Sequence, residues 1–557
     1  LDAISEVKVL LNNYQAEYGG NGGAIVNMVT KSGSDRFHGS AYWYKRHEMF
    51  NANNFFNNNT LFTSPLTGKT TTVPKPRYRY NTLGATLGGP VWLPKVHEKL
   101  KDKLFFFYSY ENQQTLSPQA LRQVTMPTAL ERQGDFTKSF TSLNSAGQPV
   151  PLFIRDPTKT GNCSASDQTA CFPGNVVPTG RINKNGQALL DVFPLPNATD
   201  LTITKGQYNY IFQESIKVPK QQNLFRVDYK PSEKDSFYAR GSMWYADNQG
   251  IAVPAGTANW GLAGLHYTFT DNGILGNWTR VITPRLVNEA SLGVRHSVEK
   301  GPPLSDAELA KLQAATYAYR LGQFNQQINP LGLIPTVSFN LISNPAAISY
   351  DGRTPLRGAD TLVSFSDNIS YTLGSHSFKA GVYVERARNY EGATSTFAGA
   401  FTFTNDTNNP LNTGFPYANA VLGNFTQYSE SDTRPSGEGR QSLLDFFVQD
   451  SWKATRRLSF EFGVRFGWYN QWYQDTKNAA AFSLERYDRS RAPQFYQPAC
   501  SVAVAPTATC ASANRRARNP VTGELLPGPL IGALVPGTGN PYNGMVVKGD
   551  SDYPRGF

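Results

Sequence analysis

The residue types that most often carry catalysis are sparse in this chain, and they do not occur at catalytic spacings. Its six histidines stand far apart, at His38, His47, His97, His266, His296 and His376. Metal sites and metalloprotease helices place their histidines or cysteines only a few residues apart. The Gly-x-Ser-x-Gly turn of serine hydrolases is also absent from the sequence. We therefore expect no enzyme, no metal site and no cofactor.

The four cysteines form two local pairs, and both pairs lie in connections rich in proline, serine and alanine. Cys163 lies close to Cys171, and Cys500 lies close to Cys510. Zinc would require closer pairs together with nearby histidines. Small disulfides that close loops in an oxidising compartment explain this spacing. The sequence therefore predicts the disulfides Cys163–Cys171 and Cys500–Cys510.

Short strands with alternating apolar and polar residues recur from residue 36 onward. In residues 458–468 the polar residues Ser459, Glu461 and Arg465 share one face. The opposite face is apolar and consists of Leu458, Phe460, Phe462, Val464, Phe466 and Trp468. A soluble sandwich would bury that face, whereas a transmembrane barrel turns it toward lipid and alternates short turns with long outer loops. The connections alternate in this way, so we predict an all-β fold, a transmembrane antiparallel β-barrel.

About eleven strands can be read from this pattern. They are expected at 37–44, 78–91, 103–112, 222–229, 236–245, 273–282, 285–298, 361–373, 377–388, 442–453 and 457–469. The long loops are expected at about 113–220, 299–360, 389–441 and 470–557. An odd number of strands cannot close a sheet in lipid without leaving backbone groups unpaired. We therefore expect an incomplete barrel, the front part of a longer one.

Composition agrees with a barrel and argues against other classes. The chain has 557 residues and a formal net charge of +11, with its lysines and arginines scattered. No nucleic-acid-binding motif accompanies this charge, so we expect no nucleic-acid partner. A positive outer face would suit the phosphates of lipopolysaccharide. The mean hydropathy is −0.42, and no apolar run approaches the roughly 18 residues that a membrane helix needs.

Residues 1–35 differ from the rest, because two short strands there flank a glycine-rich turn. A phosphate-binding loop would end in Gly-Lys-Ser/Thr and lead into a helix, and neither feature is present. The segment resembles the last stretch of the plug domain of TonB-dependent outer-membrane receptors. The matching residues are Glu6, Val7, Val9, Tyr18, Gly19, Gly22, Gly23, Val26, Asn27, Val29, Thr30, Lys31 and Gly33.

Two departures make the segment similar to the Oar-like subgroup of these receptors. Leu11-Asn12-Asn13 replaces the usual Arg-Gly-Pro, and Phe37-His38-Gly39-Ser40 leads into the first barrel strand. The resemblance implies that 1–35 is the end of a plug domain and that 36–557 is the front part of an outer-membrane barrel. It also implies active transport of a large solute, driven by an inner-membrane energy-coupling protein of the TonB type that acts on an N-terminal box outside this chain. A barrel that displays its long loops for surface adhesion or binding is the alternative.

Ligand contacts in such a channel are expected from outer loops and the inner wall. Five residues near the outer end of the first strand are candidates, because their side chains could stack on or bind a sugar or peptide. They are Trp43, Tyr44, Arg46, His47 and Phe50. Packing in an aromatic girdle and a loop explains the same residues and is the favoured interpretation.

Overall fold

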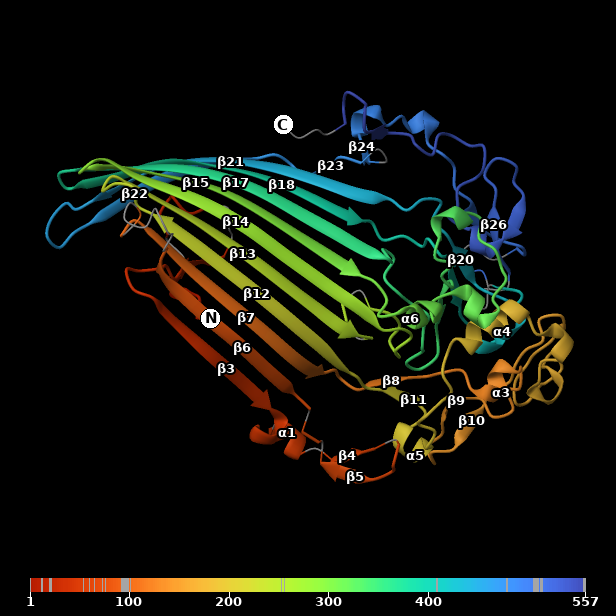
Figure 1. Cartoon of the computed structure of the whole chain (residues 1–557). Helices are drawn as coiled ribbons and strands as arrows, with labels where there is room; N and C mark the ends of the chain where they lie inside the picture. Colours follow the sequence, from red (N-terminus) through yellow and green to blue (C-terminus); the bar gives the residue numbers. More distant parts are fainter. Residues whose placement is uncertain are drawn as a thin grey trace.

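The computed structural model spans residues 1–557 (Figure 1). It describes all of them except 1, 12–13, 20–22, 54, 60, 65, 73, 76, 92–99, 101, 252, 255, 407–408, 477–478, 504–509, 511–513 and 554–557. The connection at 92–102, between the expected strands 78–91 and 103–112, lies mostly outside the described residues.

One large antiparallel sheet dominates the molecule, and its strands follow one another in chain order (Figure 1). The eleven predicted strands are confirmed, with the short β23 (Tyr473–Gln474) as an additional partner of β21. The long strands are β3 (His38–His47), β6 (Arg79–Pro90), β7 (Leu104–Pro118), β12 (Ser215–Tyr229), β13 (Asp235–Gly250), β14 (Leu265–Thr283), β15 (Leu286–Gly301), β17 (Leu356–Leu373), β18 (His376–Gly392), β21 (Ser436–Trp452) and β22 (Phe460–Tyr469).

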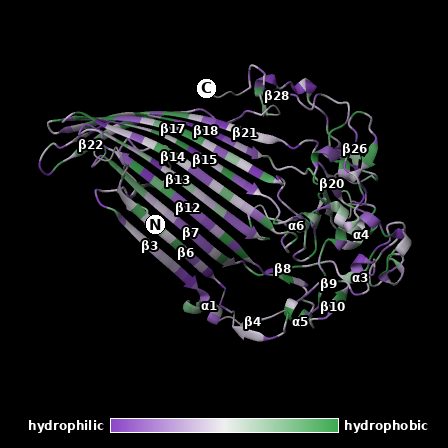
Figure 2. Cartoon of the chain, in the orientation of Figure 1, coloured by the Kyte–Doolittle hydropathy of each residue, from purple (hydrophilic) through white to green (hydrophobic). Residues whose placement is uncertain are grey.

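Each strand has an apolar face and a polar face, which appear as alternating bands in Figure 2. The apolar face is open to the surroundings: Phe462 is 57% exposed, Phe466 69% and Leu292 55%. The polar face carries Arg226, Arg465 and other charged residues that form ion pairs along the sheet. A sheet that exposes its apolar side chains and pairs its charges on the other face has the arrangement expected of a membrane-embedded wall.

The strands extend further toward the long connections than the sequence predicts. β12 begins at Ser215 rather than 222, and β14 begins at Leu265 rather than 273. In these extensions the alternation reverses, because Ile216 and Leu265 are apolar residues on the polar face. They are buried together with Val253. The regular alternation of apolar and polar residues, from which the strands were predicted, therefore ends before the strand ends.

Two aspartates, Asp367 and Asp450, lie on the apolar face, but the pairing of their strands is regular, so no bulge or register shift explains them. Nδ1 of His376 lies 2.7 Å from Oδ2 of Asp450, close to the short turn between β17 and β18. Nδ2 of Asn288 donates to Oδ1 of Asp367 at 2.6 Å. Each carboxylate therefore has a polar partner on a neighbouring strand.

Aromatic rings line the same face near the short turns. Phe237 stacks on Trp278 with ring centroids 5.9 Å apart. Trp452 stacks on His376 at 5.5 Å and on Phe460 at 5.6 Å. Such a belt is typical of the boundary between hydrocarbon and headgroups.

The long connections fold together instead of lying separately on the surface. Segments 119–214, 251–264, 302–355 and 393–435 contribute to one buried apolar cluster, which we call the loop module. Its sheet consists of β16 (Thr336–Phe339), β19 (Ala400–Phe403) and β20 (Gln427–Ser429), with β16 and β19 parallel. Phe339 and Tyr417 are each 1% exposed, with ring centroids 4.9 Å apart. The sequence predicted these segments as loops and gave no indication of a shared core.

Smaller elements complete the fold. In the loop module they are β8 (Arg122–Val124), α3 (Ala129–Arg132), β9 (Phe140–Leu143), β10 (Pro149–Pro151), α4 (Lys184–Asp191), α5 (Leu201–Thr204), β11 (Tyr210–Phe212), α6 (Asp306–Ala310) and α7 (Pro416–Leu422). Elsewhere they are β1 (Ile4–Leu10), β2 (Ile25–Thr30), α1 (Phe55–Asn58), β4 (Leu61–Thr63), β5 (Thr70–Thr72), β24 (Ala480–Phe482), β25 (Gln497–Cys500), β26 (Arg515–Arg518), β27 (Leu525–Pro527) and β28 (Met545–Val547).

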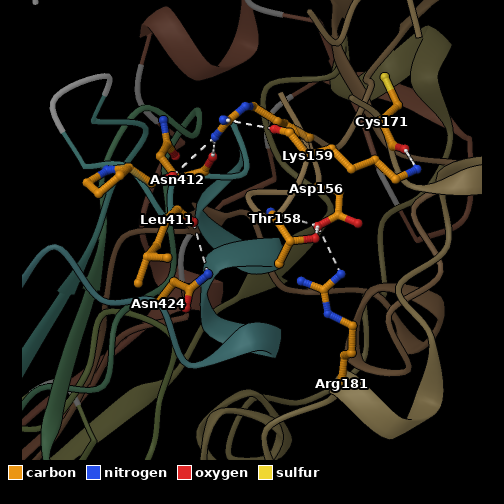
Figure 3. Close-up of polar contacts among 10 residues, drawn as sticks. Asp156, Thr158, Lys159, Cys171, Arg181, Leu411, Asn412 and Asn424 are labelled. Atoms are coloured by element: carbon orange, nitrogen blue, oxygen red, sulfur yellow. Dashed lines mark hydrogen bonds and ion pairs between the residues drawn. The ribbon is translucent and has the colours of Figure 1, made fainter. Parts of the chain in front are cut away.

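Polar contacts fasten the segments of the loop module to one another (Figure 3). Nη1 of Arg181 donates to Oδ1 of Asp156 at 2.9 Å, and Nδ2 of Asn424 donates to the carbonyl of Leu411 at 2.9 Å. Nη1 of Arg155 donates to the carbonyl of Asn412 at 3.2 Å and so joins segment 119–214 to segment 393–435. Both cysteine pairs form the predicted disulfides, Cys163–Cys171 and Cys500–Cys510.

Candidate functional site on the polar face of the sheet

The N-terminal segment lies against the polar face of the sheet rather than joining it. β1 and β2 pair with each other in a separate antiparallel hairpin. Residues 15–17 and 30 make polar contacts with four strands of the large sheet, β12, β18, β21 and β22. These contacts join the N-terminal segment to charged groups of the polar face, and they form the candidate functional site.

Arg465 on β22 is the centre of the first group of contacts. Its Nε and Nη2 donate to Oδ2 of Asp445 at 2.9 and 2.5 Å. Its Nη1 donates to the carbonyls of Glu17 and Ala16 at 3.0 and 3.3 Å. Asp445 is 1% exposed, so the ion pair is largely removed from water. The guanidinium therefore links the N-terminal backbone to a carboxylate of the sheet through charge-assisted hydrogen bonds.

Three further contacts surround Arg465. Oε1 of Gln449 accepts from the backbone N–H of Glu17 at 2.9 Å, and the ammonium of Lys379 pairs with the carboxylate of Glu17. Nε2 of Gln15 donates to Oε1 of Glu461 at 3.1 Å. β18, β21 and β22 therefore bind residues 15–17 through hydrogen bonds to the backbone and through polar contacts with the side chains of Gln15 and Glu17.

Arg226 on β12 repeats this arrangement elsewhere on the sheet. Its Nε and Nη2 donate to the carboxylate of Asp228, and its Nη1 donates to the carbonyl of Thr30 at 3.2 Å. The ring of Tyr238 lies 4.5 Å from the guanidinium carbon. At both places an arginine is oriented by an aspartate of the sheet and bonds a backbone carbonyl of the N-terminal segment.

Two glycines of the predicted plug motif permit this close approach. A Cβ atom on Gly19 would lie 2.3 Å from Nε of Arg465. A Cβ atom on Gly33 would lie 2.3 Å from the carbonyl oxygen of Phe106 and 2.7 Å from that of Gly89. Gly33 faces backbone, which cannot turn aside, so only glycine fits there without a main-chain shift.

The other plug-motif residues belong to the hairpin. Glu6 and Val7 lie on β1 with exposed side chains, while Asn27 lies on β2 and Thr30 at its end is 5% exposed. Val9 also lies on β1, and Val26 and Val29 lie on β2, whereas Tyr18, Gly23 and Lys31 lie outside the two strands. Tyr18 and Lys31 donate their backbone N–H groups to the carbonyls of Gln15 and Ala3, and Gly23 precedes β2. Gly22 lies outside the described residues.

The structure does not gather the five candidate ligand contacts into one surface. Tyr44 and Arg46 point to the polar face of β3, where Arg46 lies over the ring of Tyr78. The other three are Trp43, His47 and Phe50. Trp43 and His47 lie on the opposite face, and Phe50 is 74% exposed beyond the strand. Their role in ligand binding stays a prediction.

The described part of the chain contains no cluster of three or more histidine, cysteine, aspartate or glutamate side chains arranged to hold a metal ion. None of the described helices combines the length and apolar character needed to span a membrane. The contacts that the polar face makes with residues 15–17 and 30 are ion pairs and hydrogen bonds, which can hold a docked segment.

A family model described as an outer membrane beta barrel domain matches residues 29–544. The chain belongs to this outer-membrane β-barrel family. Its apolar face is therefore the lipid-facing side, and the protein resides in the outer membrane. The polar face, which holds residues 15–17 and 30, is the inner wall.

The chain is also similar to a curated transporter and to solved structures of a transporter and a receptor. The TonB-dependent transporter Oar of Myxococcus xanthus is 28% identical over 144 residues, which are 25% of this chain and 12% of that protein. The outer membrane transporter YddB from Escherichia coli is 8% identical with a TM-score of 0.43, over 85% of this chain and 44% of that chain. The siderophore receptor PirA from Acinetobacter baumannii is 11% identical with a TM-score of 0.40, over 85% and 45%. This chain spans less than half the length of each.

Proposed function

We propose that the chain provides the end of the plug and part of the wall of a TonB-dependent transporter that moves a large solute actively across the outer membrane. Residues 1–35 are the plug portion and 36–557 the wall with its outer loops. The contacts of Arg465 and Arg226 with backbone carbonyls of the N-terminal segment carry this proposal. The similarity to Oar over 144 residues supports the same reading.

The nature of these contacts suits a plug that must move. They are hydrogen bonds and an ion pair at the border of a hydrated lumen, each worth about 1.5–3 kcal/mol where a charged group takes part. Releasing them exposes no apolar core, because the wall side of the contact consists of Arg465, Gln449, Lys379 and Arg226. A mechanical pull can therefore break the contacts one after another.

The proposal implies specific partners. An inner-membrane energy-coupling protein of the TonB type would act through an N-terminal box that precedes residue 1. The lipid-facing residues would contact the bilayer and, at the outer end, lipopolysaccharide. The cargo would be a large solute that the protein carries without chemical change.

A second function, surface binding or adhesion, is favoured by the loop module. Four connections share one buried apolar cluster, so they form a stable surface and not four independent loops. Display of such a surface requires no movement of the plug. Energy dependence of plug movement therefore separates the two functions.

The test uses the full-length protein in cells, with Glu17→Cys as a reporter and Ala146→Cys in the exposed β9–β10 turn as a matched control. A membrane-impermeant maleimide is applied to cells with and without the coupling protein. Active transport predicts that labelling of Cys at 17 depends on the coupling protein and that labelling at 146 does not. Equal labelling at 17 in both strains would contradict transport and favour surface display.

A further inference from the structure

The loop module contains a cavity that the contacts described above do not involve. Its volume is about 530 Å³, which is within the usual range for small-molecule sites. Segment 119–214 forms most of its lining. Leu341 and Ile342 from segment 302–355, and Phe415 and Tyr417 from segment 393–435, close it. The lining is mixed: apolar and aromatic side chains alternate with hydroxyl, amide and charged groups.

One of these polar groups is the carboxyl of Glu131, which is 6% exposed. Its two oxygens accept hydrogen bonds from the backbone N–H of Thr128 at 2.8 Å and the hydroxyl of Ser139 at 2.7 Å. Neither donor is charged. Burial raises the pKa of this carboxyl and the positive charge of the adjacent Arg132 partly offsets that rise, but the guanidinium is directed to the carbonyls of Pro127 and Pro194, to which it donates.

A second polar group is the hydroxyl of Thr204, which is 2% exposed. Its Oγ1 has no hydrogen-bond partner among the described residues, and the residue lines the cavity. A buried polar atom without a partner costs about 1–3 kcal/mol, so such atoms usually meet a partner that the protein itself does not supply.

The charges around the cavity favour a cation. Asp135 adds a second carboxyl to the lining, and Lys138 is exposed at its edge. A buried carboxylate is costly unless a cation pairs with it. Burial accordingly raises the pKa of Glu131 above its ordinary value. The ammonium group of a ligand would place a positive charge directly against the Glu131 carboxylate. The aromatic side chains of the lining would pack against the apolar part of the same ligand.

We propose that this cavity binds a small amphipathic amine, with the ammonium at Glu131, a hydrogen bond to Thr204 and the apolar body against Phe415 and Tyr417. The site lies in the loop module and does not depend on transport or on the plug. It is distinct from the lumen contacts of Arg465 and Arg226.

The test measures binding of three probes of similar shape to the full-length protein in detergent micelles. The probes are 2-phenylethylamine, 2-phenylethanol and phenylacetate, which differ in charge. Saturation-transfer NMR at pH 7 should rank the amine above the alcohol and the alcohol above the carboxylate. Equal binding of amine and alcohol, strongest binding of phenylacetate, or no binding of the amine would overturn the proposal.

Variants locate the site. Glu131→Gln removes the charge but keeps the capping box of α3, because glutamine serves at that position as glutamate does. It should weaken the amine at least tenfold and leave the alcohol unchanged. Thr204→Val should weaken the amine and the alcohol alike. Asp306→Asn is the control, because Asp306 is exposed and lies in the same module outside the cavity. It should leave the affinity for all three probes unchanged, so any signal that persists in every variant reports partition into micelles. An amine affinity that Glu131→Gln leaves intact would also overturn the proposal.

The pH profile gives an independent readout. Amine binding should fall as the pH is lowered through the raised pKa of Glu131, and Glu131→Gln should remove this dependence. The charged and titratable groups nearby are Arg132, Asp135, Lys138, Tyr208 and Tyr417. Asp135 keeps a lowered pKa because Thr137 donates hydrogen bonds to it, so it titrates at lower pH than Glu131.

Discussion

Replacing Arg465 with methionine should loosen the N-terminal segment from the wall. The substitution keeps most of the apolar stem and removes the hydrogen bonds to the carbonyls of Ala16 and Glu17. A hydrogen bond from a charged donor is worth about 1.5–3 kcal/mol. The bond to Ala16 is long, at 3.3 Å, so it should contribute less than the bond to Glu17. We therefore expect the two bonds together to contribute about 2–3 kcal/mol to the free energy of docking. Docking should weaken roughly 30- to 150-fold.

The assay follows the reaction of Ala16→Cys with a maleimide in the full-length protein as urea is raised. Docking protects the cysteine, so Arg465→Met should expose it at lower urea. The matched control is Arg295→Met on the same wall, because Arg295 also pairs with an aspartate, Asp271, and its guanidinium is held there and not by the described part of residues 1–35. Arg295→Met should leave the urea midpoint unchanged.

Arg465→Met also leaves Asp445 buried without its cation, which should destabilise the wall itself. The double variant Arg465→Met/Asp445→Asn removes that charge. Heat-dependent unfolding of the barrel should therefore recover in the double variant, while cysteine protection stays weak. If Arg465→Met left protection unchanged, or if Arg295→Met reduced it equally, the reasoning from the Arg465 contacts would be refuted.

Three further predictions concern other parts of the molecule. Gly33→Ala should displace the chain where it approaches the first strands of the sheet, because the new Cβ would meet the carbonyl of Phe106. Proteolysis of residues 1–35 should therefore increase. In the control Gly276→Ala the new Cβ has nothing within 4 Å, so proteolysis should not change. Replacing Cys163 and Cys171 with serine should cost the loop module roughly 2.5 kcal/mol, measured by chemical unfolding; an unchanged midpoint would show that the bond does not constrain the module. Because burial raises the pKa of Glu131 above 4.5, its contribution to stability is complete below that pH and is lost as the pH rises through the raised pKa. The unfolding temperature of the wild type should therefore fall over this pH range. Glu131→Gln should remove that part of the pH dependence.

The wall could be predicted because the membrane imposes one rule on every strand. Phe460, Phe462, Val464 and Phe466 reveal β22 in the sequence, since lipid requires an apolar residue at every second position. The rule fails where the strand leaves the hydrocarbon region. At Ile216 and Leu265 the polarity of the two faces is reversed, and the predicted strands stop short of the true ends.

The candidate site was predicted only in part. Alternation placed Arg465 on the polar face of its strand, but the bonds of Arg465 and Arg226 to residues 16, 17 and 30 join positions 196 to 449 residues apart. No local pattern encodes such a contact. Gly19 and Gly33 were singled out by resemblance, and the structure supplies the physical reason, which is the close approach of the wall.

The loop module escaped prediction for a different reason. Phe339 comes from segment 302–355, whereas Phe403 and Tyr417 come from segment 393–435, and none of the three stands in a stretch with a clear hydrophobic period. Their shared core appears only when the strands bring the connections together. The cavity beside Glu131 and Thr204 depends on that assembly, so no signal in a single segment could have found it.

The ionic conductance of the full-length protein in a planar lipid bilayer tests directly whether the sheet encloses a lumen that residues 1–35 close. The central claim is that the sheet forms the wall of a water-filled lumen and that residues 1–35 help to close it. A lumen closed by residues 1–35 should give little conductance in the intact protein and stable open-channel steps when residues 14–33 are deleted. Steady conductance from the intact protein, or a deletion that stays closed while the barrel remains folded, would contradict it.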